Sequence, residues 1–191
     1  MRKLMQVLAV AAVCTVFTGC SGTLPLDSYM PQNLARYKYK NSVDIDVFTY
    51  EPARRKNIRA NQIENTAAGS FYVNTDIAEM VRRATVLELE KTGVPVNVAS
   101  DIVIGGDVLE LKADDLGFNV HWTYSIRYRI FRKKDQRPLF AKEYSPPMKK
   151  TEKFMPLQAL SSTIYDLVSS GYEMFIRDEG VRAILDVPAK K

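Results

Sequence analysis

The chain has 191 residues, of which 46% are hydrophobic and 26% are charged, and this is enough for one domain with its own apolar core. The net charge of +5 includes Arg2 and Lys3, and without them 25 basic residues face 22 acidic ones. Such a small excess, without a dense stripe of Lys and Arg, argues against nucleic acid as a partner.

The first residues are typical of a secretory signal. Arg2 and Lys3 precede an uncharged, largely apolar run over residues 4–17. A helix that stays in a bilayer needs about 20 such residues, so this run is too short to span a membrane permanently. We therefore expect residues 1–19 to be a signal peptide that is removed.

The end of this signal, Phe17-Thr18-Gly19-Cys20, resembles a lipobox, the recognition sequence of bacterial lipoprotein signal peptidase. The resemblance implies cleavage before Cys20, a diacylglyceride on its sulfur and an acyl chain such as palmitate on its amine, with roughly 0.8 kcal/mol of membrane binding per buried methylene. By resemblance to Gram-negative lipoproteins, Ser21 directs the protein to the periplasmic face of the outer membrane. A plain signal peptide with an incidental cysteine is the alternative.

Residues that carry catalytic chemistry are scarce after the signal. Cys14 lies in the signal and Cys20 is the expected lipid site, so no disulfide is expected, and His121 is the one histidine of the chain. A Ser-His-Asp triad, a Cys-His pair or a zinc site needs more groups than these. We therefore predict no enzyme, no metal and no cofactor, with paired carboxylates such as Asp44 and Asp46 as the remaining enzymatic alternative.

The segment after the signal predicts a tether followed by a strand. Residues 20–42 begin with the lipidated cysteine and show no sustained periodicity, so they are interpreted as a tether. Residues 43–50 alternate as in a strand, and Pro52 ends it. One face of this strand is expected to carry Val43, Ile45, Val47 and Thr49.

Residues 51–74 are irregular and predict a long loop, which carries Arg54 and Arg55. A helix should then begin after Asp76 and end at Gly93, because a glycine commonly ends a helix in the left-handed conformation. The apolar stripe typical of this helix consists of Ile77, Met80, Val81, Ala84 and Leu87.

Three extended segments and two helices complete the pattern. Residues 102–111 predict a central strand with a bulge or a close backbone approach at Gly105-Gly106. Residues 120–131 alternate most clearly, with an apolar face and a polar, basic face, and a hairpin leads to residues 139–144. A long helix follows Pro156, and a short one covers residues 181–185.

Together these elements predict an α+β fold in the order β-α-β-β-β-α, with a four-stranded mixed sheet and two helices packed on one face. Residues 43–191 form its single periplasmic domain. The helix end Glu88-Leu89-Glu90-Lys91-Thr92-Gly93 and the strand Ser100-Asp101-Ile102-Val103-Ile104-Gly105-Gly106 resemble small envelope lipoproteins, most closely the YajG family. More distantly, the chain is similar to the auxiliary lipoproteins of lipid-transport ABC systems and to the lipopolysaccharide-assembly lipoprotein.

Two functions are compatible with this pattern. The first is a non-catalytic accessory protein, anchored to the membrane through Cys20, that binds a protein partner in an envelope assembly or lipid-transport system. The second is a direct binder of anionic amphiphiles such as lipopolysaccharide or phospholipid. The candidate binding residues are Arg127, Arg129, Arg132, Lys133, Lys134, Arg54 and Arg55.

The lipobox generates the first prediction. A Cys20→Ser chain should lose labelling by a radioactive or clickable fatty acid and should leave the membrane fraction, because the serine side chain offers no thiol for the diacylglyceride. A variant that keeps both the label and the membrane association would contradict the assignment of Cys20 as the lipid site.

Overall fold

The computed structural model describes residues 22–26, 28–33, 39–55, 57–67 and 70–185. The expected signal peptide, the lipid site Cys20 and the sorting residue Ser21 lie outside these described residues.

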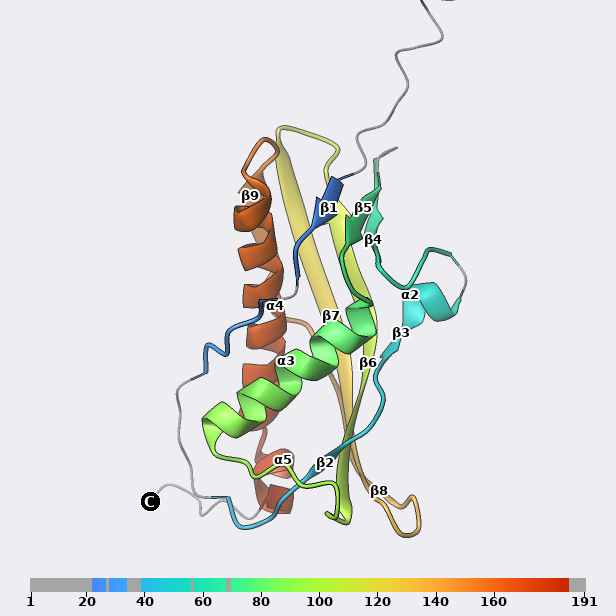
Figure 1. Ribbon diagram of the computed structural model, residues 1–191, viewed down its shortest axis with the longest axis vertical. Coiled ribbons are helices and arrows are strands. Elements are labelled where there is room, and N and C mark those ends of the chain that lie inside the picture. Colours follow the sequence, from blue (N-terminus) through green and yellow to red (C-terminus); the bar gives the residue numbers. More distant parts are fainter. Residues whose placement is uncertain (1–21, 27, 34–38, 56, 68–69, 186–191) are drawn as a thin grey trace, which may run out of the picture.

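The described residues form one mixed sheet of nine strands together with four helices (Figure 1). The main strand order is β1-β5-β4-β6-β7-β8, while β2 and β3 pair with β6, and β9 pairs with β7. The predicted four-stranded sheet with two helices is therefore wrong. The strands are β1 (Gly22–Leu24), β2 (Asp44–Ile45), β3 (Thr49–Tyr50), β4 (Gln62–Asn65), β5 (Phe71–Val73), β6 (Ile102–Asp114), β7 (Asn119–Arg132), β8 (Pro138–Tyr144) and β9 (Lys149–Glu152). The helices are α2 (Glu51–Arg54), α3 (Ile77–Thr92), α4 (Leu157–Arg177) and α5 (Glu179–Leu185).

The prediction missed β1, β4, β5 and β9, of which β4 lies along one edge of β6 after β2 and β3. The segments β2, β3 and β4 follow one another along this edge, and each pairs with β6 in parallel. Residues 51–74, predicted to be a loop, contain α2, β4 and β5. Strands of two to four residues are too short to show a period of two, which explains why the sequence pattern does not reveal them.

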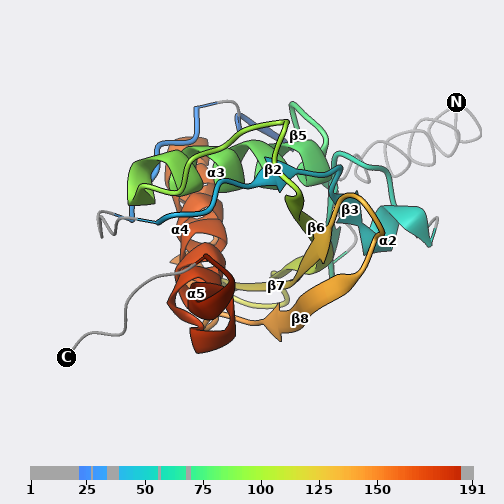
Figure 2. The ribbon, with the colours of Figure 1, turned by 90° about the horizontal axis from the view of Figure 1, so that it is seen from below.

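The β7 strand and the α4 helix form the centre of the core. The predicted apolar face of β7 is confirmed, because all its members are buried: Val120, Trp122, Tyr124, Ile126, Tyr128 and Ile130. The α4 helix packs on this face, with the rings of Tyr128 and Phe175 stacked at 4.2 Å. Both α3 and α4 lie on the same side of the β6–β7–β8 sheet (Figure 2).

A β-bulge at Leu109 changes which residues of β6 face the core. The register shifts between Val108 and Glu110, so Leu109 has no partner on β7. Ile104 and Val108 are buried before the bulge, and Leu111 and Ala113 are buried after it. One extra residue thus moves the core face from even to odd positions.

The sequence predicts a bulge or a close backbone approach at Gly105-Gly106, and the structure has a close approach there. A Cβ atom at Gly106 would lie 2.4 Å from Cε2 of Phe48, so this position requires glycine. The predicted close backbone approach is therefore found, but the bulge occurs three residues later.

The predicted strand over residues 43–50 is divided into β2 and β3, and its faces differ from the prediction. Ile45 pairs with Ile104, and Thr49 pairs with Asp107. Between these pairs the chain advances by four residues in this segment but by only three in β6, so the segment holds one extra residue. The extra residue reverses the side-chain direction. As a result Val47 is 75% exposed, while Phe48 lies in the core.

The α3 helix is found where the sequence predicts it. Asp76 is its N-cap residue, and Gly93 ends it with φ of 91° in the left-handed region. Glu79 pairs with Arg82 at 2.8 Å on the outer surface. The Asp76 side chain makes no capping hydrogen bond, and the backbone N–H of Ile77 donates instead to the Ala60 carbonyl oxygen at 3.0 Å.

Part of the segment interpreted as a tether contributes to the domain core. Leu24 in β1 and Leu26 are at most 1% exposed. A few residues later the chain is held by Glu88, a fully buried carboxylate of α3. Glu88 accepts hydrogen bonds from the hydroxyl of Tyr29, the backbone N–H groups of Gln32 and Asn33, and the hydroxyl of Ser169 on α4.

This network generates the second prediction. A Glu88→Ala change should lower the free energy of unfolding by about 3–5 kcal/mol, because several buried donors lose their acceptor. Glu90→Ala, on an exposed position of the same helix, is the matched control and should change stability by less than about 0.5 kcal/mol. Urea unfolding of the full chain measures both, and equal stabilities would contradict the role of Glu88.

Candidate functional site

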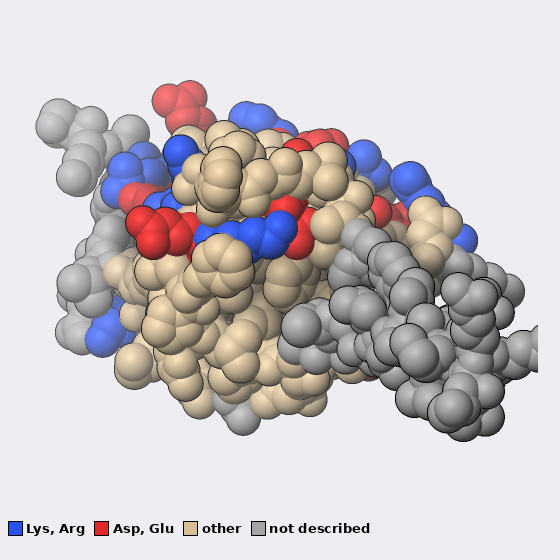
Figure 3. Space-filling view, turned by 90° about the horizontal axis from the view of Figure 1, so that it is seen from above, with Lys and Arg blue, Asp and Glu red and all other residues tan. Residues whose placement is uncertain are grey.

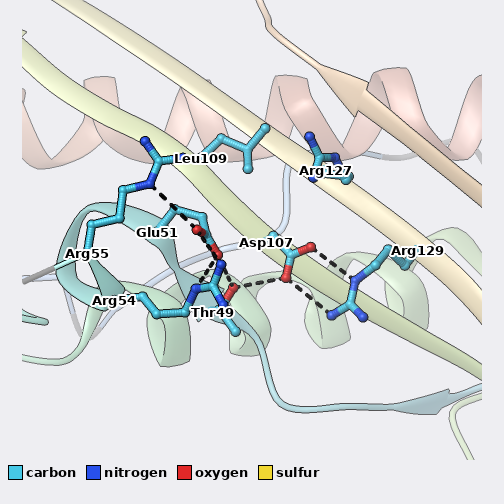
Figure 4. Close-up of a pocket in the computed structure, with 8 residues that line it drawn as sticks. All are labelled: Thr49, Glu51, Arg54, Arg55, Asp107, Leu109, Arg127 and Arg129. Carbon is cyan, nitrogen blue, oxygen red and sulfur yellow. Dashed lines mark hydrogen bonds and ion pairs between the residues drawn. The ribbon is translucent and has the colours of Figure 1, made fainter.

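A polar hollow of about 550 Å³ lies on the sheet face opposite α3 and α4, where α2 meets β6 and β7 (Figure 4). Four of its eight lining residues are arginines, so we call it the arginine hollow. Two of them come from β7, because the odd residues of that strand point away from the buried face. The lining residues are Thr49, Glu51, Arg54, Arg55, Asp107, Leu109, Arg127 and Arg129.

Arg129 is held in place by Asp107 on the neighbouring strand. Its Nη2 donates to Asp107 Oδ1 at 3.2 Å, and its Nε lies 3.1 Å from Oδ2. Thr49 Oγ1 donates to the same carboxylate at 2.9 Å. A Cβ at Gly105 would lie 3.2 Å from Arg129 Nη2, so glycine leaves room for the guanidinium to lie over β6.

Glu51, at the start of α2, organises the second pair of arginines. Arg54 Nε lies 2.8 Å from Glu51 Oε1, and its Nη2 donates to Oε2 at 2.9 Å. Arg55 Nε is farther from this carboxylate, at 3.9 Å. The hydrogen bond from Arg54 lowers the pKa of Glu51, and burial of the carboxyl opposes this shift without cancelling it.

Arg127, like Arg55, has only a distant carboxylate partner. Its Nη2 lies 3.9 Å from Glu143 Oε2 on β8, and about half of each side chain is exposed. Glu143 also accepts a hydrogen bond of 2.8 Å from Ser125. Beside Arg127, the bulged residue Leu109 supplies the aliphatic part of the wall (Figure 4).

The arrangement can bind an anionic group. Four guanidinium groups and two carboxylates line the hollow, which leaves an excess of two positive charges. Glu51 and Asp107 bind mainly Arg54 and Arg129, whereas Arg55 and Arg127 have carboxylate partners only at 3.9 Å. The last two can therefore turn toward a ligand at little cost. Arginine suits this role because its planar fork of donors matches a carboxylate or a phosphate.

The hollow offers little to an acyl chain, since Leu109 is its one aliphatic lining residue. A more apolar hollow between the N-terminal segment and α3 holds only about 100 Å³, below the roughly 300 Å³ of ordinary ligand pockets. Its lining consists of Leu26, Tyr29, Met80, Arg83 and Leu87.

The structure brings four of the predicted binding residues into the arginine hollow and leaves three elsewhere. Arg132, Lys133 and Lys134 lie at the β7–β8 connection, where Lys133 Nζ is 2.6 Å from Asp44 Oδ2. The backbone N–H of Lys134 donates to Asp101 Oδ1 at 3.1 Å. These residues are therefore a separate surface rather than an extension of the hollow.

Sequence reasoning missed Glu51 and Asp107, the acidic residues that position the arginines. Asp107 directly opposes Arg127 in the β6–β7 register and contacts Arg129 diagonally. A residue-by-residue pairing of the two strands would have found it. Glu51 has no such signal, because α2 is a four-residue helix placed by long-range contacts.

Within the part of the chain that the structure describes, no cluster of three or more His, Cys, Asp or Glu side chains could hold a metal ion. None of the helices formed by these residues combines the length and apolar character that crossing a bilayer requires.

Comparison with known proteins shows the fold but not a family. No family model matches the sequence, and no curated protein matches it. The protein XCC0632 from Xanthomonas campestris, whose crystal structure is described with the family model DUF330, is similar with a TM-score of 0.62 at 13% identity. The alignment covers 81% of this chain and 92% of that protein. The chain therefore has the same fold as this protein.

Two other solved structures are less similar. Protein CT253 from Chlamydia trachomatis has a TM-score of 0.46 at 10% identity, covering 72% of this chain and 94% of that one. A minor lipoprotein from Acinetobacter baumannii has a TM-score of 0.44 at 9% identity, covering 78% and 96%. The resemblance to the YajG family stays a prediction.

The pair of Glu51 and Arg54 generates the third prediction. A carboxyl whose pKa is lowered on folding stabilises the protein above its ordinary pKa of 4.5, and this contribution is lost as the pH falls through the folded pKa. Glu51→Gln should therefore be less stable than the natural chain at pH 7, and the difference should shrink below pH 4.5. Urea unfolding across this range measures it, and a difference that is constant with pH would contradict the ion pair.

Proposed function

We propose that this protein is a non-catalytic, lipid-anchored accessory protein of the cell envelope that binds an acidic segment of a protein partner in the arginine hollow. The anchor would be Cys20, and Ser21 would direct the protein to the periplasmic face of the outer membrane. The envelope system would be one of assembly or lipid transport.

The observation that carries this proposal is the convergence of four arginines, from α2 and its C-cap residue and from β7, on one open, polar hollow. Arginine is enriched at protein interfaces, where its guanidinium binds carboxylates through paired hydrogen bonds. Such a surface on the uncovered face of a sheet can receive acidic side chains without any rearrangement of the core.

A protein partner fits the hollow better than an amphiphile does. The lining is polar apart from Leu109, so acyl chains would find no apolar wall to cover them. An anionic lipid headgroup would also match the positive charge of the hollow. Capture from solubilised envelopes separates such a lipid from an acidic protein segment.

The fourth prediction concerns Arg55 and Arg127, whose ion pairs are the longest in the hollow. Arg55→Ala/Arg127→Ala should reduce the yield of a crosslinked protein partner at least tenfold, because it removes the two excess charges. Arg54 and Arg129 stay to neutralise Glu51 and Asp107, so the fold should be kept. The measurement is capture of the full-length tagged chain from crosslinked, detergent-solubilised envelopes.

Arg132→Ala/Arg137→Ala is the matched control, since it removes two exposed arginines outside the hollow, one at the end of β7 and one in the connection to β8. It should capture the partner as well as the natural chain does. Equal capture by the two double variants would contradict binding in the hollow. Loss of co-purifying phospholipid or lipopolysaccharide, with no protein partner in any sample, would instead favour the amphiphile-binding alternative.

A further inference from the structure

Two connections at one end of the molecule expose large apolar side chains. Leu116 and Phe118, between β6 and β7, are 74% and 91% exposed. Phe154, between β9 and α4, is 92% exposed, and Met155 and Leu157 beside it are 38% and 42% exposed. We call these five residues the apolar end. Large exposed apolar side chains that lie together, rather than scattered singly, mark an interaction surface.

The two connections are fixed side by side by backbone hydrogen bonds. Asn119 in β7 pairs with Glu152 in β9, and the backbone N–H of Lys153 donates to the Phe118 carbonyl oxygen at 3.2 Å. Lys153 Nζ also donates to the Asp115 carbonyl oxygen at 2.8 Å. Phe118 and Phe154 are therefore carried by one connected structure.

Seen from above, this end of the molecule has charged groups over one half of its described surface, and the other half is largely uncharged (Figure 3). Charges of both signs lie near the apolar end, where Lys153 Nζ is 3.9 Å from Asp115 Oδ2. A partner would thus be recognised there by apolar contact rather than by net charge.

The start of the described chain lies at the same end. Gly22 pairs with Phe71, whose ring lies 6.0 Å from that of Trp122, near the first residues of β7 (Figure 1). Only Ser21 separates Gly22 from Cys20, and a residue spans at most about 3.6 Å, so the Cα atoms of Cys20 and Gly22 are within about 7 Å of each other. The expected lipid site is therefore tied to the end that exposes these apolar residues.

We propose that the apolar end inserts into the surface of the lipid bilayer that holds the acyl chains of Cys20. This inference rests on the proposed lipid anchor. Aromatic and aliphatic side chains at the tips of connections suit the boundary between headgroups and acyl chains, where their apolar surface leaves water. The short chain between Cys20 and β1 would hold them against this boundary.

The insertion would orient the whole domain. β7 has 14 residues and rises by about 3.4 Å per residue, so its far end would stand roughly 45 Å from the bilayer surface if the strand were upright. The arginine hollow lies along the side of the sheet between the two ends. It would thus be presented to a partner in the periplasm rather than to the membrane.

The test measures the depth of a fluorescent label in full-length acylated protein reconstituted into vesicles of phosphatidylethanolamine and phosphatidylglycerol. An environment-sensitive dye is attached to Phe154→Cys, or to Val98→Cys as the matched control. Val98 is 77% exposed and lies at the opposite end, where its carbonyl oxygen accepts a hydrogen bond from Lys133. Both positions are exposed, so neither change should affect folding.

The expected result is a blue-shifted emission at position 154 that spin-labelled acyl chains quench at least threefold more strongly than the emission at position 98. Equal, weak quenching at both positions, in protein that floats with the vesicles and carries acyl chains on Cys20 by mass spectrometry, overturns the insertion but keeps the anchor. Protein that neither floats nor carries acyl chains overturns the anchor and the orientation built on it. A label shielded from water but not quenched, with crosslinked pairs of chains, assigns the surface to a second copy and overturns insertion.

Discussion

The apolar face of β7 under α4 is the contact on which the other features depend. Tyr124, Ile126 and Tyr128 occupy it, and Gly171 lets the helix approach, because a Cβ there would lie 2.9 Å from Cε1 of Tyr124. Since this face uses the even residues of the strand, the odd residues point to the opposite side of the sheet. Arg127 and Arg129 are thus presented to solvent by the same packing that forms the core.

Charge pairs then give the arginine hollow its shape. Asp107 holds Arg129 over β6, and Glu51 holds Arg54 at the start of α2. Partly exposed ion pairs of this kind add little to stability, about 0–1 kcal/mol each, so their main effect is on position. They leave Arg55 and Arg127 with more distant carboxylate partners. These two guanidinium groups are therefore available to an acidic ligand, while Arg54 and Arg129 keep the hollow in shape.

The two surfaces differ in chemistry. The arginine hollow is polar and lies along the sheet, whereas the apolar end lies where β6 turns into β7 and β9 leads into α4. The proposed anchor connects them, because a domain held by its apolar end would display the hollow at a fixed height. The buried Glu88 holds Tyr29, Gln32 and Asn33 against α3 and α4, so the chain that follows β1 is packed on the domain.

The sequence alone determined the elements whose periodicity extends over many residues, namely α3, β7 and α4, together with the basic face of β7 that carries Arg127 and Arg129. Only the tertiary structure decided the short strands along β6, the burial of Phe48 in place of Val47, and the meeting of Arg54 and Arg55 with Arg127. The physical reason is that one extra residue in a strand reverses its faces, and strands of two to four residues exist only because a distant partner pairs with them. Glu51 acquires its role through such long-range pairing, which no local pattern contains, whereas the role of Asp107 follows from the register of β6 with β7.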